Sequence, residues 1–296
     1  MMYGRGLPLR QTALLCYDRE KNIPADGICD NRRNITMVRL EMHNAAGEML
    51  FAAEHTQEAL LCVYRVYEEG DYLTVACDEA THLWVQMDET IPAGEVYIPA
   101  GQMTWRIPFG EHRRAYSPAA FVGQRHIASA RVMTADEVAA RRNVACNPAD
   151  LRGDTDFYPH ATANVETRGE SVFAARNVID GLRHNISHGD WPYQSWGIGA
   201  REDAWLNVDF GREVIVDEMA LTLRADFPHD AYWVSGHVAL SDGAEVAYDL
   251  EKTGDRQYIQ LGEHKVTWMR LERMQKSDDP SAFPSLSEWE VFGRDA

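Results

Sequence analysis

Two segments in the second half of the sequence gather the side chains that could do chemistry. Residues Leu182–Gly197 read LRHNISHGDWPYQSWG, and residues Leu223–Trp233 read LRADFPHDAYW. Sugar recognition needs an aromatic face for the apolar side of the ring, and fixed donors and acceptors for the hydroxyl groups. Arginine supplies paired planar donors, and carboxylates accept from hydroxyls. The residues that we predict to contact a sugar are His188, Trp191, Trp196, Arg224, Asp226, His229 and Trp233.

Each of these residues also has a structural interpretation. Trp196 would pack under the loop, and Trp191 would clamp a long loop. Arg224 and Asp226 would form an ion pair that holds the second segment, and His229 would belong to a turn. The concentration of such residues in two loops is a stronger indication of a binding site than any one of them.

Hydrolysis is a second chemistry that these segments permit. A glycoside hydrolase holds two carboxyl groups about 5 Å or about 6.5–9.5 Å apart across the scissile bond, and a histidine can serve as acid or base. The spacing in the sequence fixes no separation between such groups, so catalysis stays an alternative without an assigned residue. The side chains of suitable type are Asp190, Asp226, Asp230, His188 and His229.

The densest polar stretch of the first half is Arg106–Tyr116, which reads RIPFGEHRRAY. Its charged residues follow a Pro-Phe-Gly turn, so they could form an anion site or a catalytic loop. A run of this kind is also typical of a solvated connection, or of an interface with a neighbouring domain. The sequence shows no nucleophile and base in a recognisable motif.

The whole sequence of 296 residues carries 29 basic and 46 acidic residues, a formal charge of −17. Nucleic acid and anionic membranes bind basic surfaces, so we expect neither as a partner. The cysteines are scattered and form no CxxC pair, which favours small buried thiols in a reducing compartment. Residues 1–11 have no apolar targeting core, and we predict a cytoplasmic protein. The cysteines are Cys16, Cys29, Cys62, Cys77 and Cys146.

Short alternating segments separated by turns dominate the first half, and they predict an antiparallel β-sandwich. One helix interrupts this pattern, because Thr134 and Glu137 form a capping box and the helical pattern continues to Asn143. The predicted strands are Met37–His43, Glu48–Ala53, Leu61–Tyr67, Tyr72–Cys77, Leu83–Met87, Glu95–Ile98 and Met103–Ile107.

The second half is again strand-like, and it contains neither a P-loop nor a GxGxxG motif. The predicted strands are Ala204–Asp209, Glu218–Arg224, His237–Ser241, Glu245–Asp249, Arg256–Leu261, Val266–Glu272 and Ser287–Phe292. Asn147-Pro148 and Arg152-Gly153-Asp154 are typical of a linker. We therefore predict a β-rich domain over residues 1–145, a linker over 146–159 and a second domain over 160–296.

Five pieces of the second half occur in a familiar order: ARNVIDG, SW, AWLNVDFG, VALSDG and LSEWEVFG. With them, residues 160–293 resemble the factor V/VIII type C, or discoidin-like, family, which includes galactose-binding-like carbohydrate-binding modules. The resemblance implies an eight-stranded jelly roll whose binding loops cluster at one end. We therefore expect an all-β protein, in which a smaller N-terminal β-sandwich with one short helix precedes this jelly-roll β-sandwich. The two halves together resemble two-domain bacterial proteins to which we assign no function.

The resemblance also implies a structural calcium ion beneath the first loop. Ca²⁺ takes about 6–8 oxygen ligands, which mix carboxylates with backbone carbonyls. Gly181 suits the sharp turn between the ligands, because glycine tolerates a positive φ. The alternatives are a plain Asp-Gly turn, or a sodium ion. The ligands that the resemblance implies are the carbonyl oxygens of Asn177 and Leu182 and the side chains of Asp180, Ser195 and Glu288.

The function that we expect from these observations is non-catalytic carbohydrate binding by the C-terminal domain. In a jelly roll of this family, the loops Leu182–Gly197 and Leu223–Trp233 would meet at one end. Two other functions stay open at this point. One is a protein–protein interaction module, and the other is a glycoside hydrolase that acts on a soluble saccharide.

Overall fold

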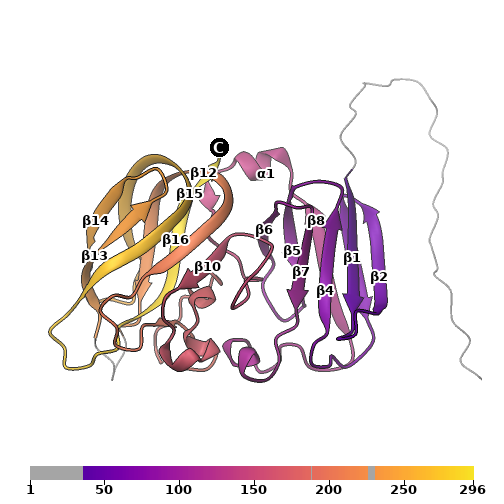
Figure 1. The fold of residues 1–296 in the computed structure, drawn as a ribbon, viewed down its shortest axis with the longest axis horizontal. Helices are drawn as coiled ribbons and strands as arrows, with labels where there is room; N and C mark the ends of the chain where they lie inside the picture. Colours follow the sequence, from indigo (N-terminus) through magenta and orange to yellow (C-terminus); the bar gives the residue numbers. More distant parts are fainter. Residues whose placement is uncertain (1–35, 188, 226–230) are drawn as a thin grey trace, which may run out of the picture. The chain divides into compact units, whose positions relative to one another are not determined.

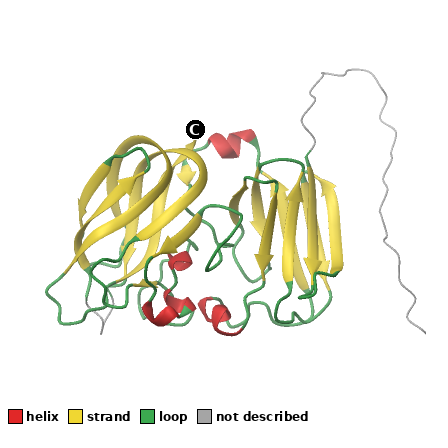
Figure 2. Ribbon diagram, viewed as in Figure 1, coloured by secondary structure: helices red, strands yellow, loops and turns green. Residues whose placement is uncertain are grey.

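The computed structural model describes residues 36–187, 189–225 and 231–296. His188, Asp226 and His229, three of the residues predicted to contact a sugar, lie outside these ranges. Strands dominate the described chain (Figure 2), so the expected all-β class is confirmed. Within the same ranges, no helix combines the length and the apolar character that spanning a membrane requires.

The N-terminal sandwich consists of two four-stranded antiparallel sheets, coloured indigo to magenta in Figure 1. Alternation buries one face of each sheet, as in β1, where Val38, Leu40 and Met42 have no exposed area. The first sheet has the order β2 (Met49–Thr56), β1 (Met37–His43), β4 (Tyr72–Cys77) and β7 (Gln102–Arg106). The second has the order β3 (Glu58–Val63), β8 (His126–Val132), β5 (Thr81–Gln86) and β6 (Gly94–Ile98).

The one α-helix of the described residues, α1 (Ala135–Ala139), begins at the predicted capping box, where the Thr134 hydroxyl accepts from the Glu137 backbone N–H. The prediction that the helix continues to Asn143 is wrong. Arg142–Asn143 forms the short strand β9, which pairs with β16 (Ser285–Asp295) near the C-terminal end of the sequence. The Asn143 side chain accepts from the backbone N–H of Val291 at 3.0 Å, so pairing across the fold overrides the local helical preference.

The C-terminal sandwich is formed by eight antiparallel strands that share one hydrogen-bonded sheet system. The two longest strands, β12 (Leu206–Leu223) and β15 (Gln257–Lys276), bend at irregularities in their pairing. The core contains Trp196, Phe210 and Trp289, all without exposed area. The order is β11 (Trp196–Gly197), β16 (Ser285–Asp295), β12 (Leu206–Leu223), β15 (Gln257–Lys276), β13 (Trp233–Leu240) and β14 (Glu245–Asp249), with β10 (His160–Ala163) on β12 and β9 on β16.

The segment predicted as a linker, residues 146–159, packs against the N-terminal sandwich. Ala149 and Phe157 belong to that core, and the Trp105 indole N–H donates to the carbonyl oxygen of Ala149 at 2.9 Å. Four short 3₁₀ helices lie on either side of this segment in the sequence. They are η1 (Gly110–Ala115), η2 (Thr167–Gly169), η3 (Ser171–Phe173) and η4 (Ala175–Val178).

Five charged side chains, which we call the clamp, join the two sandwiches: His82, Glu95, Arg142, Arg212 and Asp295. Glu95 of β6 accepts from Arg142 at 2.5 Å and from Arg212 at 2.8 Å. Asp295 of β16 lies 3.0 Å from Arg212 and 2.7 Å from the ring of His82. Burial opposes ionisation of Glu95, but hydrogen bonds from Arg142 and His82 outweigh it and lower its pKa to about 2.

Candidate functional site

Three of the residues predicted to contact a sugar are buried instead. The Trp196 ring has no exposed area and Trp233 is 2 % exposed, and the two rings stack with their centroids 5.9 Å apart in the C-terminal core. Arg224 is 3 % exposed, and its guanidinium donates to the carbonyl oxygen of Tyr193. A sugar cannot reach these side chains in this conformation, so the structure gives them structural roles.

Trp191 is the one described member of that set with an open face, and 36 % of it is exposed. Its backbone N–H donates to the carbonyl oxygen of Arg114, which belongs to η1 of the other sandwich, at 3.3 Å. The Arg114 guanidinium in turn donates to the Asp190 carboxylate at 2.8 Å. The loop of the C-terminal sandwich is therefore held against η1 beside an exposed tryptophan.

The residues predicted to hold calcium surround the turn at Gly181, whose φ is +83°. Asp180 accepts from the backbone N–H of Leu182 at 2.9 Å, and Glu288 accepts from the N–H of Gly181 at 3.1 Å. The side chain of Asn177 donates to the Ser195 carbonyl oxygen at 3.2 Å. All five predicted residues thus take part in hydrogen bonds at or beside this turn.

Two buried carboxylates in this network interact unfavourably, and we call Asp180 and Glu288 the carboxylate pair. Burial raises the pKa of Glu288 well above its usual value, and the nearby Asp180 raises it further. Burial also raises the pKa of Asp180, although the Arg176 guanidinium, 3.8 Å away, opposes this shift. The buried oxygens around the pair that lack a hydrogen-bond partner within the described chain are Glu288 Oε2, Ser195 Oγ, Gln194 Oε1 and Thr222 Oγ1. Carboxylate, hydroxyl and amide oxygens are the ligand atoms that a hard cation such as Ca²⁺ takes, so these residues fit such an ion.

A hollow of about 340 Å³ opens beside Trp191. Both sandwiches line it: Arg113, Arg114 and Tyr116 come from the N-terminal one, and Asp190 and Trp191 from the C-terminal one. We call it the open hollow. The sequence stretch Arg106–Tyr116, for which an interface was one interpretation, thus supplies one wall of it. Two aromatic rings, two guanidinium groups and one carboxylate meet there.

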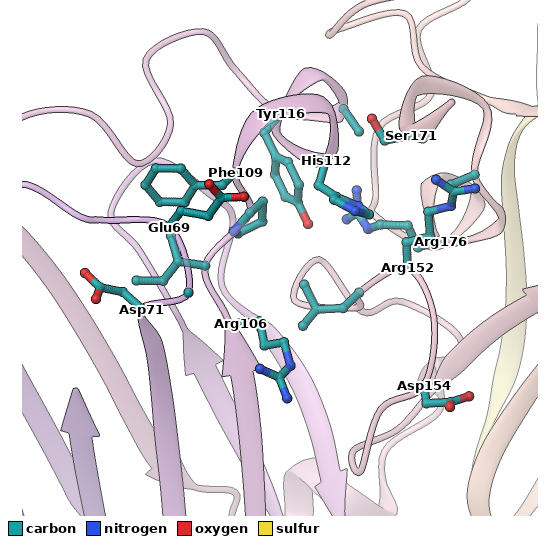
Figure 3. A pocket seen from close by; sticks show the side chains of 16 residues that line it. Glu69, Asp71, Arg106, Phe109, His112, Tyr116, Arg152, Asp154, Ser171 and Arg176 are labelled. Carbon is teal, nitrogen blue, oxygen red and sulfur yellow. The ribbon is translucent and has the colours of Figure 1, made fainter. Parts of the chain in front are cut away.

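A second cavity, of about 260 Å³, lies on the other side of Tyr116, and we call it the inner cavity (Figure 3). It too is lined from both sandwiches. At its wall, the backbone N–H of Ser171 donates to Glu111 of η1 at 2.7 Å. Its lining is Glu69, Gly70, Asp71, Arg106, Ile107, Pro108, Phe109, His112, Ala115, Tyr116, Leu151, Arg152, Asp154, Ser171, Ala174 and Arg176.

Sequence reasoning did not assign Arg113, Arg114 or Tyr116 to a sugar site. The polar run itself was visible, and so was the Pro-Phe-Gly turn before it. The sequence did not show that this run lies beside Trp191, because the contacts between the two segments join residues far apart in the chain. Arg114 and Asp190, for example, are 76 positions apart. Only the fold shows which loops share a hollow.

No protein-family model and no curated protein sequence matches this chain. Among solved structures, chitosan-binding module 1 from the chitosanase/glucanase of Paenibacillus sp. IK-5 is 20 % identical over 51 % of this chain and 99 % of the module, with a TM-score of 0.36. The lectin domain of lectinolysin, in complex with the Lewis B antigen, is 21 % identical over 52 % of this chain and 98 % of that domain, with a TM-score of 0.39. The family 32 carbohydrate-binding module of C. perfringens NanJ, in complex with galactose, is 18 % identical over 45 % of this chain and 91 % of that module, with a TM-score of 0.35.

Proposed function

We propose that this protein binds a carbohydrate at the open hollow, without chemical conversion. The observation that carries the proposal is the exposed face of Trp191 beside the Arg114–Asp190 pair. An aromatic face can stack on the apolar side of a sugar ring, and the guanidinium and carboxylate groups can donate to and accept from its hydroxyls. The volume of about 340 Å³ lies at the lower end of small-molecule sites.

This site differs from the one expected from the loops alone. Trp191 is retained with its neighbour Asp190, whereas Arg113, Arg114 and Tyr116 come from the N-terminal sandwich. The affinity should be modest, because each sugar hydroxyl exchanges hydrogen bonds with water for bonds with protein at a net gain of only about 1 kcal/mol. An isolated C-terminal sandwich would lack the wall formed by Arg113, Arg114 and Tyr116.

A glycan array probed with the purified full chain tests the proposal. We expect Trp191→Ala to lose binding to the oligosaccharides that the unmodified protein retains, because the stacking face is removed. Trp84→Ala is the matched control: Trp84 is 40 % exposed, on β5, with the Arg131 guanidinium 5.8 Å from its ring centroid. Loss of binding in both variants, or in neither, would contradict the proposed site.

The same array separates the other two functions. A turnover assay on every glycan that binds would show whether a hydrolysed product appears, and a product would replace simple binding with hydrolysis. If no glycan binds at all, the proposal fails. A protein-interaction role would then be the remaining interpretation of the hollow.

We further propose that the carboxylate pair holds a calcium ion that supports the loop carrying Trp191. The residues that would hold it are Asn177 and Leu182 through backbone carbonyls, and Asp180, Ser195 and Glu288 through side chains. The support for this proposal is the set of buried oxygens without partners together with the raised pKa values of both carboxylic acids. Such an ion would neutralise the buried charge and stiffen the turn at Gly181.

A further inference from the structure

The inner cavity is separate from the open hollow, although Tyr116 lines both. Its walls are fixed by contacts that point away from its interior. Asp71 lies 3.1 Å from Arg65, and Arg152 lies 2.6 Å from Glu166, neither of which belongs to the lining. The cavity therefore has a defined shape, as sites that bind small molecules usually do.

Arg176 strengthens that frame from the C-terminal side. Its guanidinium donates to the carbonyl oxygens of Asp150 at 2.7 Å and Pro148 at 3.2 Å, and lies 4.7 Å from the Tyr116 ring centroid. This buried cation is thus occupied by groups of the protein itself. It holds the Tyr116 ring in place, and we assign it no contact with a ligand.

The Ser171 hydroxyl of the lining donates to the carbonyl oxygen of Glu111 at 2.6 Å. Five other polar side chains of the lining have no hydrogen bond or ion pair within the described ranges. Three can donate: Arg106, His112 and the hydroxyl of Tyr116. Two can accept, Glu69 and Asp154. Figure 3 shows the Tyr116 hydroxyl and the His112 ring in the same part of the cavity, with Arg106 below them. Donors and acceptors of opposite charge are thus both available, so the lining does not select a strongly charged ligand.

Apolar side chains line the rest of the inner cavity. Ile107, Phe109, Leu151 and the ring of Tyr116 face the same space as these polar groups. A ligand that matches has an apolar face, several hydroxyl groups around its edge and no net charge. The volume of about 260 Å³ suits one sugar ring better than a chain of them.

We propose that the inner cavity is a second binding site, which takes a neutral monosaccharide or a polyol of that size. The N-terminal sandwich supplies Arg106, His112 and Tyr116 to it, which gives this domain a role in recognition. The site does not depend on Trp191, which lines only the open hollow among these two. It is therefore testable independently of the proposed glycan site.

Isothermal titration of the full chain with neutral hexoses and hexitols, with a hexuronic acid and an amino sugar as comparators, tests the inference. We expect saturable binding of a neutral compound that weakens at least about tenfold in the double variant Arg106→Ala/His112→Ala, because two donors are lost. Arg125→Ala is the control, since this exposed arginine lies on the N-terminal sandwich outside the cavity lining. Trp191→Ala should bind the neutral compound as the unmodified protein does.

Three outcomes would overturn the inference. The first is that no neutral compound binds, and the second is that the double variant binds as tightly as the unmodified protein. The third is that only the charged comparators bind, which would show that the lining selects charge. If binding is lost in Trp191→Ala and kept in the double variant, the sugar occupies the open hollow. The inner site is then wrong while the proposed function stands.

Discussion

The clamp and the carboxylate pair each shield two acidic side chains from most of the solvent, yet the pKa values of these side chains move in opposite directions. In the clamp, Arg142, Arg212 and His82 surround Glu95 and Asp295, and the pKa values of both carboxyl groups fall. In the carboxylate pair, burial raises the pKa values of both Asp180 and Glu288, and the nearby Asp180 raises that of Glu288 further. Burial is common to both regions, so the difference lies in the cations that the chain supplies.

This difference shows which cluster needs a cation from outside. Ligand atoms of His82, Glu95 and Asp295 lie within 4.8 Å of one another, a spacing that would suit a metal ion. Two guanidinium groups already neutralise them, so a further cation would meet repulsion. Near the carboxylate pair, Arg176 lies 3.8 Å from Asp180, whereas Arg183 pairs with another acidic residue, Glu290, at 3.5 Å. Several buried oxygens around the pair also lack partners. Short distances between ligand atoms are therefore a weaker criterion for a metal site than unbalanced charge.

The largest effect should come from removing a cation from the clamp. Arg212→Ala leaves Glu95 and Asp295 buried with less compensation, and breaking a buried pair costs about 3–5 kcal/mol of unfolding free energy. Urea unfolding, monitored by tryptophan fluorescence, measures this loss of unfolding free energy. Arg141→Ala is the control: its guanidinium pairs with Asp217 at 2.6 Å but is 47 % exposed, so about 1 kcal/mol or less is expected. Equal losses in both variants would show that the clamp is no stronger than a surface pair.

The carboxylate pair should respond to calcium, with the next largest effect. A ligand that binds only the folded state adds about 2.7 kcal/mol of stability at a hundredfold excess over its Kd. We expect the melting temperature to rise on titration of Ca²⁺ into chelator-treated protein, and Glu288→Gln to abolish that rise.

The stability of Glu288→Gln without calcium separates the effect of the buried charge from the effect of side-chain packing. In chelator at neutral pH, Glu288→Gln should be more stable than the unmodified protein, because an amide of the same shape replaces a buried carboxylate near Asp180. Glu95→Gln, the matched change in the clamp, should be less stable than the unmodified protein. A calcium response that survives in Glu288→Gln would place the ion elsewhere.

Much of the fold follows from alternation, and its errors have identifiable causes. Strands β1 and β4 have the predicted bounds because large apolar residues alternate along them. Strand β8 was not predicted, since its inward residues include Ala128 and Ala130, which give a weak apolar signal. Strand β12 was predicted as two strands, one on each side of Gly211. In the structure the backbone adopts a positive φ at Gly211, but the strand continues to pair beyond this residue.

The candidate site was harder to predict, because residue type does not reveal which side of a loop faces solvent. Trp191 and Trp196 lie five positions apart in one segment, yet the first is 36 % exposed and the second has no exposed area. Trp233 begins β13 and faces inward, where it stacks on Trp196. The wall of the open hollow that η1 supplies depends on contacts between the sandwiches. Local patterns do not encode such contacts.

The smallest expected effect is the dependence of stability on pH that His82 contributes to the clamp. Burial lowers its pKa, but hydrogen bonds to Asp295 and Glu95 outweigh this, so the pKa is raised above 6.5. The contribution is therefore fully present below about pH 6.5 and is lost as the pH rises through the folded-state pKa. The free energy of unfolding, measured in urea with saturating Ca²⁺, should fall across this range by about 1 kcal/mol in the unmodified protein, and less in His82→Gln. Below the ordinary glutamate pKa of 4.5 the sign reverses, because stability from ionised Glu95 is lost as the pH falls toward about 2. An unchanged slope in His82→Gln between pH 6 and 8 would mean that the two arginines alone balance the clamp, which would sharpen its contrast with the carboxylate pair.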